Sequence, residues 1–171
     1  PIFKEKNKKI LTRKRGNGYW LWKPYFIYRT LSQQMNEGDI LIYTDAAIDY
    51  VNSTKYLIKT MEVNNLDILS FHLPPHLTES KYTRRDTFIL MDADTEEFTK
   101  TPQINGAIQL YKKTEFSLQF AHEYLKYACI PQIIMDRSNI FGDNYPDHID
   151  HRHDQSVFSL LVKKNKLKIV K

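Results

Sequence analysis

The densest group of potential ligand-binding side chains in this 171-residue chain lies in residues 15–24, RGNGYWLWKP. This segment contains both tryptophans and two of the five glycines. Glycine lets a backbone approach a ligand closely, and Trp and Tyr offer flat faces on which a sugar or a base can stack. Lys23 would stand at the start of a helix, where the backbone dipole already favours an anion. The segment therefore predicts a binding site, although Trp20 on its own could be a core residue.

Three short polar clusters follow farther along the chain. Asp45 comes directly after an apolar stretch, and its carboxylate suits a hard cation or a ribose hydroxyl. The alternative interpretation is that Asp45 has no ligand and only begins the following turn. Arg84 and Arg85 form a pair suited to bidentate phosphate binding, although charged runs are usually solvated. The amides of Gln103 and Asn105 flank an apolar stretch and could bind hydroxyl groups.

A fourth cluster is the most concentrated and occupies residues 149–156, IDHRHDQS. His and Asp side chains can ligate a divalent metal, Asp can act as a general base, and Gln can orient a hydroxyl. Asp154 would also be a good N-cap for the helix that follows, and both roles can coexist. Asp92 and Asp94 lie in an acidic stretch and are interpreted as a solvated turn.

The elements that must position these residues alternate between helix and strand. A strand, a helix and a strand in succession imply a parallel pair joined by a crossover. Pro24 fits the first turn of a helix that stops near Gly38, and Ser53 could cap the next helix. An aromatic stripe at helical spacing predicts a core-facing helix and consists of Phe116, Phe120, Tyr124 and Tyr127. The predicted strands are residues 39–43, 68–71 and 104–111, and a long loop at 136–153 precedes a final helix at 154–163.

Composition indicates one domain, because 171 residues with 42% apolar content can bury a sizeable core. The single cysteine, Cys129, excludes an internal disulfide and favours a reducing, cytoplasmic location, although a Golgi enzyme could have the same cysteine content. No apolar run approaches the roughly 20 residues of a membrane span. The sequence therefore predicts one domain over residues 1–171 without a transmembrane segment.

The net charge of +5 comes from the two ends of the chain. Seven of the 25 cations lie in residues 1–15 and five in residues 163–171, which leaves 13 cations against 19 carboxylates in the rest. An acidic body is poorly suited to track a phosphate backbone, so nucleic acid is not an expected partner. The basic ends are interpreted as solvated tails that could touch a membrane surface peripherally.

In order, these motifs resemble those of glycosyltransferase-like proteins of the GT-A type found in bacteria and large viruses. The resemblance covers nearly the whole chain from Arg15, and the chain is more distantly similar to the glycogenin-like retaining transferases. It implies an α/β fold with a GT-A-like, Rossmann-like mixed sheet flanked by helices, and transfer of a sugar from a nucleotide diphosphate donor, often with manganese or magnesium. The motifs that carry it are GYWLWKPY at 18–25, GDILIYTDA at 38–46, Arg85-Asp86, TPQ at 101–103 and DHRHDQS at 150–156.

The resemblance also implies roles for individual residues. Lys23 would reach the donor, Asp45 would be the first acid of the metal motif, and Asp154 and Gln155 would be the catalytic pair. Position 47 is Ala rather than Asp, so His151 or His153 would have to complete a metal site with Asp45. The expected donor-binding residues are Tyr19, Trp22, Lys23, Asp45, Arg84, Arg85, Asp86, Gln103, Asn105 and Gly106. Residues 1–15 offer no nucleotide-binding first strand, so the chain is expected either to lack that edge of the fold or to bind the base differently.

The expected function is therefore transfer of a hexose from a nucleotide sugar to a glycan or another acceptor hydroxyl. A catalytically inactive nucleotide-sugar or glycan binder is the first alternative, favoured by Ala47. A basic-tailed nucleic-acid binder is the second, disfavoured by the acidic body. The functional interpretation predicts that Asp45 and residues 151–155 lie in one cleft, because separated polar clusters usually converge only at a site.

Overall fold

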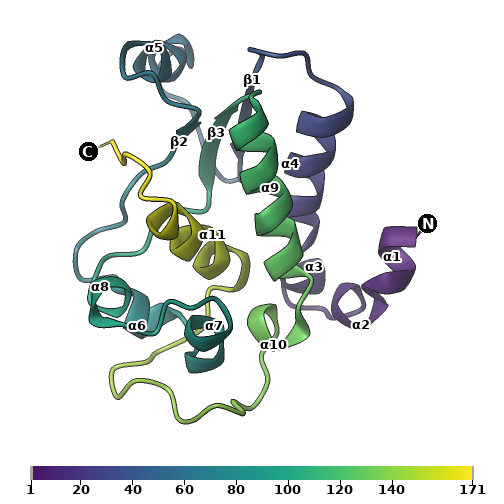
Figure 1. Ribbon diagram of the computed structural model, residues 1–171, viewed down its shortest axis with the longest axis vertical. Coiled ribbons are helices and arrows are strands. Elements are labelled where there is room, and N and C mark those ends of the chain that lie inside the picture. Colours follow the sequence, from purple (N-terminus) through teal and green to yellow (C-terminus); the bar gives the residue numbers. More distant parts are fainter. Residues whose placement is uncertain (1, 171) are drawn as a thin grey trace.

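A three-stranded antiparallel sheet forms the centre of the computed structural model, which describes residues 2–170 (Figure 1). Strand β3 (Ile108–Lys112) lies between β1 (Ile40–Thr44) and β2 (Ile68–Leu69) and runs antiparallel to both. The predicted parallel pair is wrong, because β1 and β2 point the same way but the later strand β3 separates them. The mixed α/β class is confirmed, and a GT-A-like, Rossmann-like identity stays a prediction.

The two faces of the sheet pack against different helices. Tyr111 and Ile68 join the large core formed with α4 (Trp22–Gln33), α9 (Glu115–Ala128) and α11 (His153–Lys164). Leu110 and Leu69 face the other way and pack with Met61 of α5 (Lys55–Val63). This alternation is the period of two that a strand imposes on its side chains. The result is a sheet with an apolar side chain layer on each face.

The long helices agree with the sequence pattern except at their ends. Helix α4 begins at Trp22, so Pro24 is its third residue, and it ends before the turn at Gly38, whose φ is +89°. Helix α5 is assigned from Lys55, but Thr54 already has helical φ and ψ, and the Ser53 hydroxyl accepts the Lys55 N–H at 3.3 Å, so Ser53 caps this helix as predicted. Helix α9 starts with a capping box between Thr114 and Ser117. The described residues 135–152 form no helix or strand, which confirms the predicted loop.

The aromatic stripe of α9 is only partly buried. Phe120 and Tyr124 are 3% and 0% exposed, whereas Phe116 is 36% exposed. Tyr127 is half-buried against the core. The stripe therefore spans the boundary between core and surface, because a helix lying on a sheet buries a narrower arc than its apolar residues cover.

Several short helices escape the sequence pattern, because a helix of four to six residues shows no full period. They are α1 (Ile2–Lys6), α2 (Lys8–Leu11), α3 (Gly16–Tyr19), α6 (Glu79–Tyr82), α7 (Arg85–Leu90), α8 (Glu96–Thr99) and α10 (Pro131–Ile134). The predicted strand at 104–111 begins only at Ile108, since Ile104 makes an isolated bridge to His72. No helix within residues 2–170 is long and apolar enough to cross a membrane.

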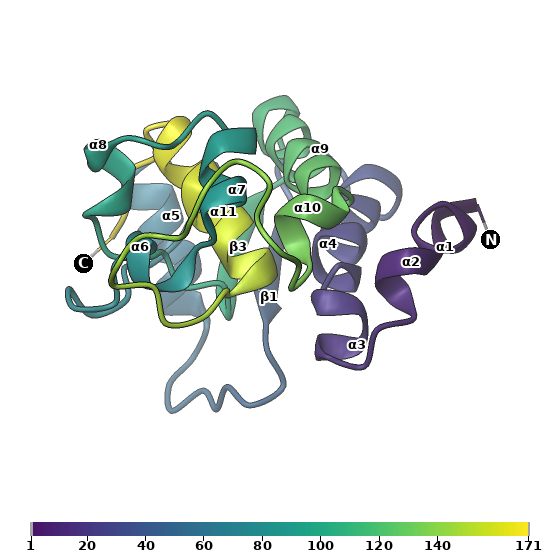
Figure 2. The same ribbon diagram turned by 90° about the horizontal axis from the view of Figure 1, so that it is seen from below.

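The basic ends are ordered rather than tail-like. Helix α2 packs through Ile10, which is 1% exposed, Phe3 of α1 is partly buried against the same cluster, and Val170 bridges to Phe71. Pro1 and Lys171 lie outside the described residues. Figures 1 and 2 show the N-terminal helices and the C-terminal end on opposite sides of the molecule. The two basic ends therefore do not form one continuous surface.

Candidate functional site

A cleft of about 210 Å³ is lined by residues from three separate segments of the chain. Asp45 and residues 151–155 both line it, which confirms their predicted proximity. The cleft lies where α4, the end of β1 and the start of α11 meet. Its lining residues are Arg15, Trp20, Lys23, Asp45, Asp150, His151, Arg152, His153, Asp154 and Gln155.

Lys23 is the buried centre of this cleft. Its Nζ lies 2.7 Å from Asp154 Oδ2 and 3.2 Å from Asp45 Oδ1, and it donates to the Gly106 carbonyl at 3.2 Å. The side chain is only 4% exposed. Lys23 does lie at the entrance of α4, as predicted, but two carboxylates already neutralise its charge, and its contact with a donor stays a prediction. Through these ion pairs and the hydrogen bond to Gly106, the ammonium connects three other segments of the chain to α4.

Asp154 is part of the same ion-pair cluster and is not an N-cap. Helix α11 begins one residue earlier, so Arg152 occupies the cap position and Asp154 lies in the first turn. Its Oδ2 accepts hydrogen bonds from Lys23 and, at 3.3 Å, from the Tyr124 hydroxyl. Burial raises the pKa of Asp154, and the nearby Lys23 charge opposes that shift. The capping prediction fails because Asp154 turns inward toward Lys23.

Asp45 is the more accessible carboxylate of the pair, with 37% of its side chain exposed. Its backbone N–H donates to the Ala107 carbonyl at 2.9 Å, which fixes it beyond the end of β1. Its Oδ1 accepts a 2.6 Å hydrogen bond from the Tyr43 hydroxyl. Burial and the adjacent Asp45 raise the pKa of Tyr43, so this hydroxyl stays a donor. Among the described residues no hydrogen bond reaches Asp45 Oδ2.

Gln155 lies against Gly106, and the two residues fix each other. The Gly106 N–H donates to Gln155 Oε1 at 3.0 Å, and Gln155 Nε2 donates to Gln103 Oε1 at 2.8 Å. A Cβ at position 106 would lie 2.9 Å from Gln155 Cβ, so only glycine fits without a shift. The side chain of Asn105 accepts the Ala107 N–H at 2.7 Å and shapes the same loop.

Gln103 is fully buried and does not line the cleft. Its Nε2 lies among four acceptors, of which Glu79 Oε2 and Thr83 Oγ1 are each 3.1 Å away. This arrangement leaves Oε1 to receive the Gln155 amide. Gln103 therefore orients Gln155 and does not reach a ligand itself.

His151 and His153 are buried and held by main-chain carbonyls. His151 Nε2 lies 2.8 Å from the Ile133 carbonyl, and its Nδ1 accepts the Arg84 N–H at 3.4 Å. His153 Nδ1 lies 2.7 Å from the Ile134 carbonyl, and its buried Nε2 has no hydrogen-bond partner. Burial lowers the pKa of both imidazoles, which keeps them neutral at pH 7.

These bonds do not fit the predicted metal set of Asp45, His151 and His153. Both ring nitrogens of His151 are engaged in hydrogen bonds with main-chain groups, and so is one ring nitrogen of His153. Within residues 2–170 no group of three or more His, Cys, Asp or Glu side chains is arranged to hold a metal ion. A manganese or magnesium ion stays a prediction, for which Asp45 is the accessible ligand.

Arg84, Arg85 and Asp86 lie outside the cleft lining and stabilise the loop at 135–152. Arg84 donates to the Met135 carbonyl at 2.6 Å, and burial lowers its pKa. Arg85 pairs with Asp94 at 2.7 Å and lies over the Tyr145 ring. Asp94 is therefore a partly buried ion-pair partner, not part of a solvated turn. The arginine pair is engaged within the protein, which explains why it is not presented to a phosphate.

The aromatic residues of the opening segment divide between core and cleft. Tyr19 is buried against His153, with ring centroids 4.8 Å apart, and the indole N–H of Trp22 donates to the Gly16 carbonyl at 3.1 Å. Neither lines the cleft. Half-buried Trp20 does, and it stacks on His153 with centroids 5.6 Å apart.

Arg15, Asp150 and Arg152 lie in the two segments that the sequence singled out, but they were given no individual role, although all three line the cleft. Arg15 bridges Asp136 at 3.0 Å and Asp150 at 2.6 Å across the rim. Its place beside Gly16 in the opening segment was the available signal. Comparison of the chain with models of known protein families, with curated proteins and with solved structures found no match.

Proposed function

We propose that this chain transfers a hexose from a nucleotide diphosphate sugar to a hydroxyl of a glycan or another acceptor. The observation that carries the proposal is the buried Lys23 with its two carboxylates and the Gly106 carbonyl, drawn from segments far apart in sequence. Buried charges gathered at a concave surface are typical of functional sites. The resemblance of the same segments to GT-A motifs supports the same assignment.

The cleft offers a separate partner for each part of such a donor. The indole of Trp20 provides a flat face for a base or a sugar ring. Arg15 and Arg152 supply cations for the diphosphate. The ion pairs of Arg15 with Asp136 and Asp150 are exposed, and pairs of that kind are worth only about 0–1 kcal/mol, so a diphosphate can replace them at little cost.

The transfer forms a bond from the acceptor oxygen to the anomeric carbon and breaks the bond from that carbon to the diphosphate oxygen. The nucleoside diphosphate leaves with the electron pair, and the cations of the cleft stabilise its charge. The acceptor proton passes to a carboxylate, for which Asp45 is the accessible one. Gln155 positions the sugar through its amide, and Asp154 acts on Lys23 as a positioning residue.

A nucleotide-sugar binder without catalysis is the second candidate. Ala47 favours it, because this residue leaves Asp45 without the second carboxylate of a paired metal motif. The two candidates bind the same donor and differ only in turnover. Binding and turnover therefore have to be measured separately.

The test is a thermal-shift screen of nucleotide sugars, with and without manganese, followed by assays of donor hydrolysis and transfer. A donor at 100 times its dissociation constant should stabilise the fold by about 2.7 kcal/mol. Asp45→Asn should reduce turnover about 100-fold or more. The exposed loop variant Asp143→Asn is the control and should behave as wild type. Stabilisation without turnover assigns the binder, and absence of any stabilisation contradicts both candidates.

A further inference from the structure

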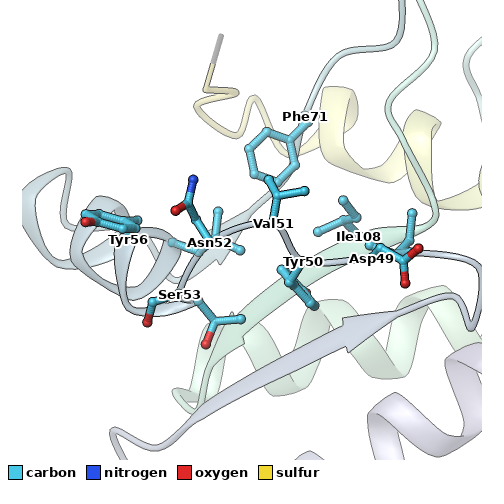
Figure 3. Close-up of a pocket in the computed structure, with 11 residues that line it drawn as sticks. Asp49, Tyr50, Val51, Asn52, Ser53, Tyr56, Phe71 and Ile108 are labelled. Atoms are coloured by element: carbon cyan, nitrogen blue, oxygen red, sulfur yellow. The ribbon is translucent and has the colours of Figure 1, made fainter.

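A second cavity has a volume of about 530 Å³, and its lining begins at Ile48, three positions after Asp45 of the cleft (Figure 3). It is formed by residues 48–54, Tyr56 and Leu57 at the start of α5, Phe71 and Ile108. Figure 2 shows the segment that joins β1 to α5 projecting from the body of the molecule. The cavity therefore lies between a projecting loop and the first residue of the central strand β3.

Its walls are apolar and unusually exposed. Val51, Tyr56 and Tyr50 are 92%, 68% and 43% exposed. Leu57 and Phe71 at the base pack on the hydrophobic cluster around Met61. Exposed apolar side chains scattered singly need no explanation, but a group around one cavity is typical of a binding site. The volume falls within the roughly 300–1,000 Å³ range of small-molecule sites.

The charges of the two cavities differ. The lining of this cavity contains no Lys or Arg, and Asp49 is its charged residue. The cleft, in contrast, contains Arg15, Lys23 and Arg152. An anionic diphosphate therefore belongs in the cleft, whereas the larger cavity suits an uncharged, apolar group.

The backbone connects the two cavities directly. The Ile48 N–H donates to the Asp45 carbonyl at 3.0 Å, and the Asp45 N–H donates to the Ala107 carbonyl at 2.9 Å. Ala107 in turn lies between Gly106, which contacts Gln155, and Ile108, which lines the cavity. A ligand bound in the cavity would thus lie one turn away from the Asp45 carboxylate.

We infer that this cavity binds an apolar alkyl or aryl group carried by the acceptor, with the acceptor's hydroxyl-bearing part directed toward Asp45. The assignment of the ligand as an acceptor rests on the proposed function. The binding of an apolar group does not, because it follows from the cavity alone.

The test uses monomeric octyl β-glucoside as the probe, below its micelle concentration, with methyl β-glucoside as the comparison. Amide chemical shifts should change saturably at residues 48–57, Phe71 and Ile108 with the octyl compound only. Val51→Ser should weaken binding about threefold or more, because it removes an apolar side chain from the wall. Val63→Ser is the matched control, since Val63 is 75% exposed on α5 but does not line the cavity.

Equal shifts with both glucosides, no saturable shifts, or equal weakening by the two valine variants would overturn the inference. A dimer in wild type that Val51→Ser dissociates would also overturn it, because a second copy would then fill the cavity. Nucleotide-sugar stabilisation is measured on the same samples. Octyl glucoside binding without any donor binding supports the apolar site and contradicts the proposed function alone.

Discussion

At the residue scale, Lys23 shows how strongly a buried charge depends on its partners. The ammonium is compensated by Asp154, Asp45 and the Gly106 carbonyl. Replacing one member of such a cluster leaves the remaining charges buried and uncompensated. The geometry of the cleft therefore depends on the ion pair remaining intact.

Lys23→Met should destabilise the fold by about 3–5 kcal/mol, because Asp154 would remain as an unpaired buried carboxylate. The double variant Lys23→Met/Asp154→Leu should recover much of that loss. Urea unfolding measures both effects, and Lys59→Met, at an exposed position of α5, is the control. A single variant as stable as this control would show that the pair is not buried in solution.

The buried histidines make stability depend on pH. Burial lowers the pKa of His151 and His153 below the ordinary value of 6.5. The unfolded chain therefore takes up more protons than the folded protein as the pH falls through 6.5. The contribution of the two neutral histidines to the free energy of unfolding is therefore fully present above pH 6.5. Below that pH it declines by up to about 1.4 kcal/mol per pH unit for each histidine.

This decline can be measured by urea unfolding at about pH 7.5 and about pH 5.5. Asp154 acts in the opposite direction, since burial raises its pKa. The imidazole resonances of His151 and His153 should therefore be followed directly by NMR. A titration midpoint at or above 6.5 for either residue would contradict the buried, neutral assignment.

At the element scale, the link between α2 and α4 is unusual because residues 16–20 all have positive φ. The values are 54°, 49°, 92°, 53° and 57°, so α3 is a left-handed turn. Each residue other than glycine in this region costs roughly 1–2 kcal/mol. His153, which stacks on Trp20, also has a positive φ of 45°. Strained backbone of this kind clusters at functional sites.

Gly16→Ala should destabilise the protein by about 3 kcal/mol or more, because the new Cβ adds overpacking against the Trp20 ring to the left-handed strain. Gly38→Ala is the matched control. Gly38 also has positive φ, but nothing lies within 4 Å of its added Cβ, so only about 1–2 kcal/mol should be lost. Chemical denaturation compares the two variants, and equal losses would show that Trp20 does not pack on Gly16.

The sequence predicted the long elements better than their arrangement. The apolar periods identified β1, α4, α9 and α11 to within a few residues. The position of β3 between β1 and β2 could not be predicted. The alternation of apolar and polar residues along a strand shows which side chains share a face, but it does not show which strands lie next to each other. Likewise, Asp154 looked like a cap because its inward partner, Lys23, is 131 positions away and leaves no local trace. The convergence of Asp45 with residues 151–155 was predictable because each lies where a strand or a loop leads into a helix, and separated polar clusters usually converge only at a site.

At the scale of the whole molecule, the charge of the two ends has different consequences. The N-terminal lysines of α1 and α2 are exposed. At the other end, Lys163 lies 2.7 Å from the buried Glu79 and is 12% exposed. The prediction of solvated tails fails for this lysine, because its partner lies 84 positions earlier.

Lys163→Met should lower the unfolding free energy by about 3 kcal/mol, because it leaves the Glu79 carboxylate buried without a counter-charge. Lys166→Met, at an exposed position two residues beyond the helix, should change it by less than about 0.5 kcal/mol. Thermal and urea unfolding measure both variants. A similar small effect for both would place Lys163 in solvent.

The pairing of β1 with β3 also determines which insertions the protein can accept. Thr44 lies opposite Ile108, and the next hydrogen bond joins Asp45 to Ala107. An extra residue inside β1 would shift this register and turn every following side chain to the other face, so Asp45 would leave the cleft. An extra residue in the exposed turn at 49–53 lies beyond the last bond of the ladder and would leave the spacing of Asp45 and Gly106 unchanged. Length variation among natural variants should therefore be absent from the two strands.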